Sequence, residues 1–269
     1  MRGWDKKEFK KRVKELRPLI SESREKELNE AETRRRLEKV LTELLGYDAF
    51  SDLSGELMVR GTGTDHLDYA VKLNGQLRII IEVKPACTTL GEKHLRQVIS
   101  YGMNAGVEWC LLTNSVDWKL YHIEFTKPIK PTLVLDFNIL NDCIDELYVK
   151  MAHLTKRSIL KNSLEKLWQK TEGLSPMQLF KATFTSSTIN SVRKNIRKET
   201  EILVTPEEVV SAFRKMLNEN ALKILNDMSF SYLERKPRKI RAKKEEQTEI
   251  LNQGTNNVLS DSNSGTANS

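Results

Sequence analysis

The sequence lacks any apolar run long enough to cross a membrane. A membrane-spanning helix needs about 20 mainly apolar residues, and no such stretch occurs. The N-terminal stretch, Met1 to Lys14, is charged where a secretory signal would carry an apolar block. We therefore expect a soluble, cytoplasmic protein without a membrane partner.

Cysteine and histidine are too few and too scattered to suggest a zinc site. No cysteine has a Cys or His neighbour at the short spacings that hold zinc, and we expect reduced, mostly structural thiols. The three cysteines are Cys87, Cys110 and Cys143. The histidines are equally scattered, and we expect packed or surface residues. They are His66, His94, His122 and His153.

A nucleotide-binding loop of the form Gly-x-x-x-x-Gly-Lys-Ser/Thr is also absent, so the chain cannot bind and hydrolyse ATP by that route. Positive charge, in contrast, is in excess. The 44 Lys and Arg against 37 Asp and Glu give a net charge of +7 and a pI near 9.2. This excess is compatible with a polyanionic partner such as nucleic acid, although many basic proteins bind none.

Length and composition predict several segments, because 269 residues exceed the usual size of one domain. We expect an N-terminal helical arm over 1–24, an α/β domain over 25–137 and a small all-helical domain over 138–232. A basic and then polar tail over 233–269 is too poor in apolar residues to pack, so we expect it to be disordered.

The two ends carry separate expectations. A helix from Met1 to Leu16 shows little apolar periodicity and is interrupted by Pro18, which is typical of a solvated arm. The basic cluster at 234–244 is either a phosphate-binding arm or a solvated charged linker. Within the helical domain, Ser175-Pro176 and Thr205-Pro206 are typical of helix starts.

The α/β domain is expected to begin with a helix capped by Asn29, whose apolar stripe ends at Gly46. A strand, an Asn74-Gly75 turn and a second strand follow, then a helix and further strands. The expected ranges are strands 67–73 and 77–84, a helix over 92–104, and strands 109–113, 118–125 and 133–137. This order predicts a mixed α/β sheet with helices on its faces.

One strand joins apolar residues to two charges. Glu82 and Lys84 follow the run Ile79-Ile80-Ile81, and alternation along the strand places both charges on one face. Partly buried charges are costly unless they are paired or bind an ion. The pair therefore indicates either a site or, more plainly, a Glu82–Lys84 ion pair on an edge strand.

Asp68 lies in the preceding strand, and the register of the hairpin decides whether it meets Glu82. A strict two-residue Asn74-Gly75 turn would set Asp68 level with Ile81, on the wrong face. A three-residue loop would set it opposite Ile80, with Glu82 as its diagonal neighbour. We predict an odd-length loop or a bulge.

Two nearby carboxylates can hold Mg²⁺ through hard oxygen ligands and leave positions for water and a phosphate oxygen. Lys84 can orient that water or offset charge that develops in the transition state. The pattern therefore predicts phosphodiester hydrolysis without a covalent enzyme intermediate.

Three further residues have two readings each. Glu30 lies two turns before Leu37 on the core-facing stripe, so it either joins the carboxylates or is a favourable acid at a helix N-terminus. Gln97 and Tyr101 share one helix face four residues apart. They contact phosphate or water in one reading and form a polar surface pair in the other.

Together, Asp68, Glu82-Val83-Lys84 and Gln97-x-x-x-Tyr101 resemble the motif of the PD-(D/E)XK nuclease superfamily. More narrowly, residues of about 25 to 150 resemble the N-terminal nuclease domain of type I restriction enzyme R subunits, and less distinctly the part after them looks like the extension of stand-alone relatives. The segments that carry this narrower resemblance are 29–34, 44–47, 106–109, 113–114 and 118–121.

The resemblance implies a restriction-endonuclease-like sheet and a Mg²⁺ ion, replaceable by Mn²⁺. In that family the motif Asp and Glu bind the metal and the Lys is catalytic, roles that fall on Asp68, Glu82 and Lys84. It also implies that Glu30 and the main-chain carbonyl of Val83 are further metal ligands. Gln97 and Tyr101 would form the auxiliary motif of the catalytic site.

The chain departs from the family in two places. Leu67 stands where the motif has Pro, which puts little in doubt, and the ATP-driven translocase of a full R subunit is absent. We expect a Mg²⁺-dependent endonuclease that acts on DNA in restriction, defence or repair. The alternative is a non-catalytic nucleic-acid-binding or complex-assembly module. RNA stays open as a substrate, as does a homo-oligomer or partner protein bound through the helical domain.

Overall fold

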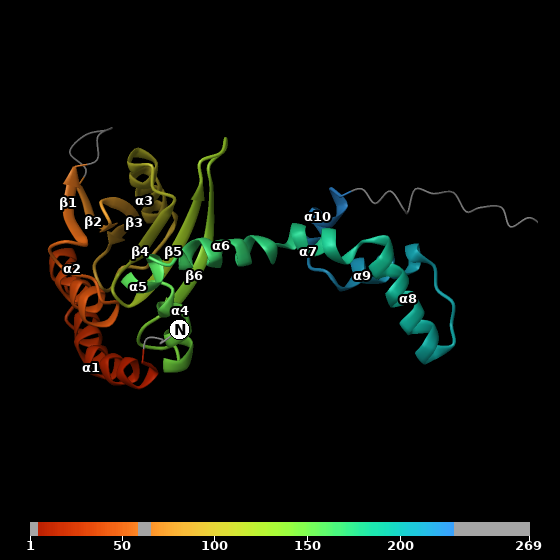
Figure 1. The fold of residues 1–269 in the computed structure, drawn as a ribbon, viewed down its shortest axis with the longest axis horizontal. Coiled ribbons are helices and arrows are strands. Elements are labelled where there is room, and N and C mark those ends of the chain that lie inside the picture. The colour runs from red at the N-terminus through yellow and green to blue at the C-terminus, as the bar shows by residue number, and fades with distance from the viewer. Residues whose placement is uncertain (1–4, 59–65, 229–269) are drawn as a thin grey trace, which may run out of the picture. The chain divides into compact units, whose positions relative to one another are not determined.

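The computed structural model describes residues 5–58 and 66–228 and divides the chain into two compact units, Met1–Leu179 and Phe180–Ser269 (Figure 1). The predicted disordered tail and its basic cluster at 234–244 lie outside the described residues. No helix in the described part combines the length and the apolar character that a membrane crossing requires.

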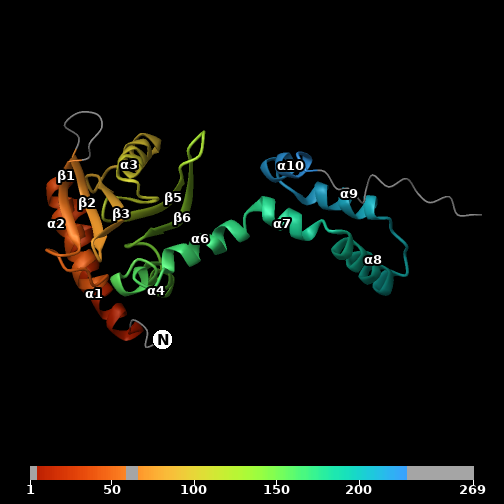
Figure 2. The same cartoon turned by 45° about the horizontal axis from the view of Figure 1, so that its top comes forward.

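The first unit is built on one six-stranded sheet whose strands lie in chain order (Figures 1 and 2). They are β1 Leu53–Met58, β2 His66–Leu73, β3 Gln76–Val83, β4 Trp109–Thr113, β5 Asp117–Glu124 and β6 Lys130–Asn138. Neighbouring strands are antiparallel except β3 and β4, which run parallel. The predicted mixed α/β fold is confirmed, and β1 is a strand that was not predicted.

Helices cover both faces of this sheet. They are α1 Lys6–Glu25, α2 Glu30–Lys39, the π-helical turn η1 Val40–Leu44, α3 Glu92–Ala105, α4 Ile144–Ala152, α5 Lys156–Ile159 and α6 Ser163–Gly173. The larger core joins one sheet face to residues of every helix except α3. The smaller core joins the other face to α3, whose Gly102 packs so closely that an added Cβ would come within 2.7 Å of Cys110 Sγ.

The alternation of β3 assigns its side chains to the two cores. Ile79, Ile81 and Val83 belong to the larger core, whereas Ile80 belongs to the smaller core under α3. Glu82 alternates with Val83, so it lies on the α3 face of the sheet. The predicted division of this strand into two faces is confirmed.

The N-terminal helix corrects one prediction. α1 continues to Glu25 with Pro18 inside it, and its side chains Phe9, Val13 and Ile20 are buried in the larger core. The expectation of a helix interrupted at Pro18 and forming a solvated arm is therefore wrong. Pro18 itself is exposed, and α1 keeps its helical path on both sides of it.

The helix after α1 agrees with the sequence pattern. The Asn29 side chain accepts a hydrogen bond from the amide of Glu32, which is the N-cap geometry. The stripe from Leu37 to Leu45 is buried, and Gly46 ends it at φ 78°. This cap fixes where α2 starts and therefore where Glu30 lies.

The region after residue 138 is divided between the two units. α4, α5 and α6 contribute to the core of the first unit, so the predicted boundary at 138 differs from the division after Leu179. A separate small core holds the remaining helices, which are α7 Pro176–Thr183, α8 Ser186–Thr200, α9 Pro206–Met216 and α10 Glu219–Asn226. Both predicted helix starts, at Pro176 and Pro206, are confirmed.

Candidate active site

The turn of the β2–β3 hairpin is shorter than predicted. Leu73 pairs with Gln76, so the loop is the two residues Asn74 and Gly75, with φ of 53° and 78°. Positive φ at both central residues is the geometry of a type I′ turn, which Asn-Gly favours. The expectation of a three-residue loop is wrong.

A β-bulge follows this turn and restores the register that the site needs. Lys72 pairs with Leu77 and Val71 pairs with Ile79, so Arg78 is an extra residue on β3. Beyond the bulge, Tyr69 pairs with Ile81. Continuing this register sets Asp68 level with Glu82. The predicted bulge is confirmed, while the predicted partner of Asp68, Ile80, is wrong.

The two carboxylates therefore lie on the same, α3-facing side of the sheet. Ala70 and Ile80, which pair directly, are both in the core under α3, and Asp68 and Glu82 are each two residues further along the same face. Both carboxylates are buried, with Asp68 at 7% and Glu82 at 2% exposure.

Asp68 is held by a main-chain and a side-chain donor. Its Oδ2 accepts a hydrogen bond of 2.7 Å from the amide of Val83, and its Oδ1 lies 3.3 Å from Nη1 of Arg34. Burial raises the pKa of Asp68 above its usual value, and the Val83 hydrogen bond opposes that rise. The backbone of β3 thus orients this carboxylate before any ligand binds.

Glu82 is the most deeply buried acid of the site. Its Oε1 accepts a hydrogen bond from the ammonium of Lys84, while Oε2 is buried without a hydrogen-bond partner. Burial raises the pKa of Glu82 to about 7, and the Lys84 ammonium only partly counters this. An unpartnered buried carboxylate oxygen is costly in a folded protein. It therefore marks a place where a cationic ligand would be favourable.

Lys84 connects Glu82 to Glu30. Its Nζ bonds Glu82 and lies 3.8 Å from Oε2 of Glu30, and its side chain is 12% exposed. Burial alone would lower the pKa of Lys84, but the hydrogen bond to Glu82 and the nearby carboxylates raise it. The lysine is therefore held as a cation between two acids.

Glu30 comes to the site because the start of α2 packs beside the segment after β3. The amide of Ala86 donates a 3.4 Å hydrogen bond to the carbonyl of Leu28, just before α2. Glu30 is the first residue of the helix, and its side chain is 42% exposed. The structure brings Glu30 to Lys84, but it is a more open member of the group than Asp68 and Glu82.

The predicted auxiliary pair lies on α3. The Gln97 side-chain amide donates a 3.1 Å hydrogen bond to the Tyr101 hydroxyl. Tyr101 is buried at 4% exposure and belongs to the core under α3, so the reading of a purely surface pair does not hold for it. A contact of this pair with a phosphate or a water stays a prediction.

Two residues near the site were not predicted to belong to it. Arg34 pairs with Asp68, and its place one helical turn after Glu30 is the signal that was available in the sequence. His94, in the first turn of α3, is close enough to Lys84 for the ammonium to lower its pKa, after the larger effect of burial. No sequence pattern pointed to His94.

The residues present suit a hard divalent cation in part. Among residues 5–58 and 66–228, no group of three or more Asp, Glu, His or Cys side chains is gathered closely enough to hold a metal ion. Asp68 and Glu82 nevertheless offer carboxylate oxygens on one face, and the unpartnered Oε2 of Glu82 is an oxygen of the kind that Mg²⁺ binds. Glu30 would have to move closer to complete such a set.

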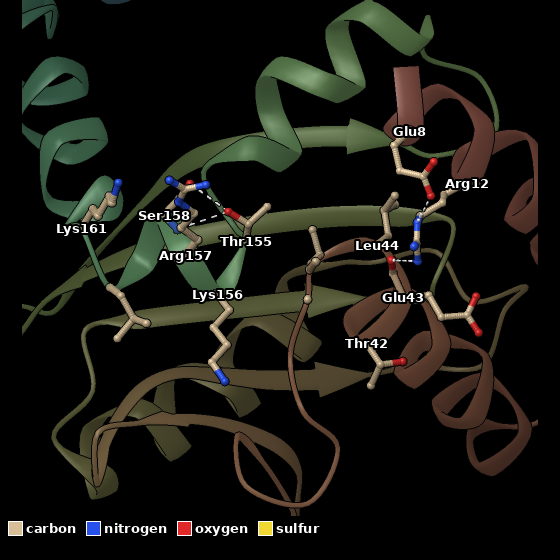
Figure 3. Close-up of a pocket in the computed structure, with 13 residues that line it drawn as sticks. Glu8, Arg12, Thr42, Glu43, Leu44, Thr155, Lys156, Arg157, Ser158 and Lys161 are labelled. Atoms are coloured by element: carbon tan, nitrogen blue, oxygen red, sulfur yellow. Dashed lines mark hydrogen bonds and ion pairs between the residues drawn. The ribbon is translucent and has the colours of Figure 1, made fainter. Parts of the chain in front are cut away.

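A separate hollow of about 860 Å³ lies between α1, η1 and α5 (Figure 3). Its cations already have acidic or carbonyl partners: Arg12 bonds Glu8 and the carbonyl of Glu43, and Lys156 pairs with Asp52. None of the predicted site residues lines it. The hollow is therefore distinct from the carboxylate site.

Comparison with known families supports the sequence resemblance. Residues 29–132 match the family described as type I restriction enzyme R protein N terminus (HSDR_N). No curated protein and no solved structure matches the chain significantly. The predicted resemblance is thereby confirmed for the stretch from α2 into β6, which contains Asp68, Glu82 and Lys84.

Proposed function

We propose that this protein is a metal-dependent endonuclease that hydrolyses phosphodiester bonds of DNA, with Asp68, Glu82 and Lys84 as its catalytic group. The observation that carries the proposal is the convergence of these side chains, with Oε2 of Glu82 buried and unpartnered. The match of residues 29–132 to a restriction enzyme family supports DNA as the substrate and restriction or defence as the setting.

The placement of the charges is costly for folding and useful for chemistry. Two buried carboxylates on one face repel each other, and burial raises the pKa of both. A hydrophobic pair at these positions would make a more stable protein. Groups that are arranged at the expense of stability in this way are typical of active sites, although structural ion pairs also perturb pKa values.

Each residue has a separate task in this proposal. A bound Mg²⁺ would polarise the scissile phosphate and lower the pKa of a water molecule. Asp68 and Glu82 supply the anionic oxygens that hold the cation, and the Val83 amide keeps Asp68 oriented. Lys84, held as a cation by Glu82 and Glu30, faces the charge that grows on the phosphate oxygens.

The test is cleavage of supercoiled plasmid, linear duplex and single-stranded DNA by purified protein in Mg²⁺ or Mn²⁺. We expect wild type to cleave at least one substrate, and Asp68→Asn and Lys84→Met to lose cleavage. Asp145→Asn and Lys130→Met are the matched controls, because these side chains are exposed and pair elsewhere on the surface. Both controls should cleave at the rate of wild type.

The outcomes separate the proposal from its rival. Equal cleavage by wild type and by Asp68→Asn would identify a contaminating nuclease and contradict the proposal. DNA binding without cleavage in either metal would favour a non-catalytic nucleic-acid-binding or assembly module. Cleavage of RNA in place of DNA would retain the catalytic group but overturn the substrate.

A further inference from the structure

Arg34 enters the carboxylate group by a single contact. Its Nη1 is 3.3 Å from Oδ1 of Asp68, and its side chain is 25% exposed against 8% for Asp68. The contact is longer than the usual charge-assisted hydrogen bond of about 2.7 to 2.9 Å. An arginine that bound this acid for stability alone would be expected to use both of its parallel donors.

The two oxygens of Asp68 have different partners. Oδ2 is committed to the main-chain amide of Val83 at 2.7 Å, which belongs to the sheet itself. Oδ1 is therefore the oxygen that is available for a ligand, and Arg34 is the group beside it. A cation that binds Asp68 through Oδ1 has to compete with the guanidinium.

The charges of the group indicate how this competition ends. Three carboxylates, from Glu30, Asp68 and Glu82, face two cations, from Lys84 and Arg34. The excess is one negative charge when all are ionised. Binding of one divalent cation would change it to one positive charge, which complements the single negative charge of a phosphodiester.

We propose that Arg34 is the counter-ion that a divalent cation displaces from Asp68, and that the released guanidinium then faces the phosphate. This inference rests on the proposed function, because it needs a cation at Asp68 and Glu82. Arg34 is thus a positioning residue for Asp68 in the metal-free protein. Its place on α2, one turn after Glu30, keeps it beside the site after it is displaced.

The test is a calorimetric titration of metal-free protein with Mg²⁺ and with Mn²⁺, without DNA. We compare wild type with Arg34→Gln, Arg34→Lys and the control Arg35→Gln. Arg35 is the next residue on α2, is 78% exposed and pairs with Glu32. We expect Arg34→Gln to bind the cation roughly three- to tenfold more tightly, because removing one competing charge of this kind is a modest effect. Arg34→Lys and Arg35→Gln should bind it about as wild type does.

A second readout separates this role from a structural one. At saturating Mg²⁺, Arg34→Gln should cleave DNA more slowly than wild type although it binds the cation more tightly. A variant that merely loosened the fold would bind the cation more weakly, and thermal melting of each variant checks this. Equal or weaker cation binding by Arg34→Gln overturns the displacement.

The failures of the two proposals are distinguishable. If wild type binds neither Mg²⁺ nor Mn²⁺, the cation of the proposed function and the displacement of Arg34 fall together. If wild type binds the cation and cleaves DNA while Arg34→Gln binds it with unchanged affinity, only the displacement falls. Tighter binding with an undiminished cleavage rate would overturn the part of the inference that concerns the phosphate.

Discussion

Asp68 lies level with Glu82 because the bulge at Arg78 shifts the pairing of β2 and β3 by one residue. Without this extra residue, the two-residue turn would set Asp68 against Ile81 and send its side chain to the other face of the sheet. The site therefore depends on a local irregularity of the backbone, of a kind that often re-aims a side chain beside an active site.

Deleting Arg78 should abolish function while Arg78→Ala should keep it. The deletion restores regular pairing and separates the two carboxylates, and misplacing a reacting group by even about 1 Å can cost about 100-fold in rate. The substitution leaves the extra residue in place and removes only a side chain. Plasmid cleavage and Mg²⁺ titration of both variants provide the measurement, and melting curves check that the deletion variant is folded. Full activity of a folded deletion variant would contradict this account.

Glu82 should make the metal-free protein less stable as the pH rises. Its pKa is about 7 in the folded protein against 4.5 unfolded, so the folded state binds the proton more tightly. The stabilisation is complete below pH 4.5 and is lost as the pH rises to about 7. A rise of this size corresponds to at most about 3 kcal/mol.

The measurement is urea unfolding of wild type and Glu82→Gln in EDTA at pH 5 and pH 8. The variant cannot ionise, so its stability relative to wild type should increase between the two pH values by up to about 3 kcal/mol. Adding Mg²⁺ at pH 8 should stabilise wild type and not the variant. A difference between the two proteins that stays constant with pH would show that Glu82 is not perturbed by burial.

Glu30 allows its two sequence readings to be separated. If it serves the cation, Glu30→Gln should weaken Mg²⁺ binding roughly tenfold, as for other partners of metal ligands. If it only complements the start of α2, Glu30→Gln and Glu32→Gln should both cost about 0.3 to 1 kcal/mol of stability and leave Mg²⁺ binding unchanged. Glu32 is the matched control, because it lies in the same first turn and pairs with Arg35. We expect the first result, since Lys84 lies 3.8 Å from Glu30.

Local patterns in the sequence were sufficient to predict the elements that carry the site. The Asn29 cap, the apolar run before Glu82 and the Asn74-Gly75 turn each depend on neighbouring residues, and the structure has all three. The position of the bulge was not predictable, because an extra residue at Arg78 leaves no signal in the alternation of Leu77 and Ile79. The result that two carboxylates share a face was expected, but through a different register.

Long-range packing explains the predictions that failed. Pro18 is a helix breaker by local rules, yet α1 keeps its course because Phe9, Val13 and Ile20 are buried in the core of the sheet. Arg34 and His94 reach the site only because α2 and α3 dock at the end of β3. No spacing within either helix reports such docking, so tertiary contacts had to be seen.

The packing of α6 on the sheet should weaken in acid. His122 of β5 stacks on Trp168 of α6 with ring centroids 4.1 Å apart, and it also contacts Trp109 edge-on. Burial lowers the pKa of His122 below its usual value, although the acids Glu108, Glu124 and Glu165 oppose this. The folded state therefore binds this proton less readily than the unfolded chain does. Stability from the neutral ring is complete above about pH 6.5, the usual histidine value, and falls as the pH drops below it.

His122→Gln tests this role because a neutral amide has no proton to gain. Wild type should lose stability between pH 7 and pH 5 at this site, and Trp fluorescence should report the loosening of Trp168. The difference in the free energy of unfolding between wild type and variant should shrink over that range. His153→Gln is the control for the general loss of histidine, since burial also lowers the pKa of His153 but it has no ring contact with Trp168 among the described residues. An equal response of both variants would locate the acid sensitivity elsewhere than the contact of His122 with α6.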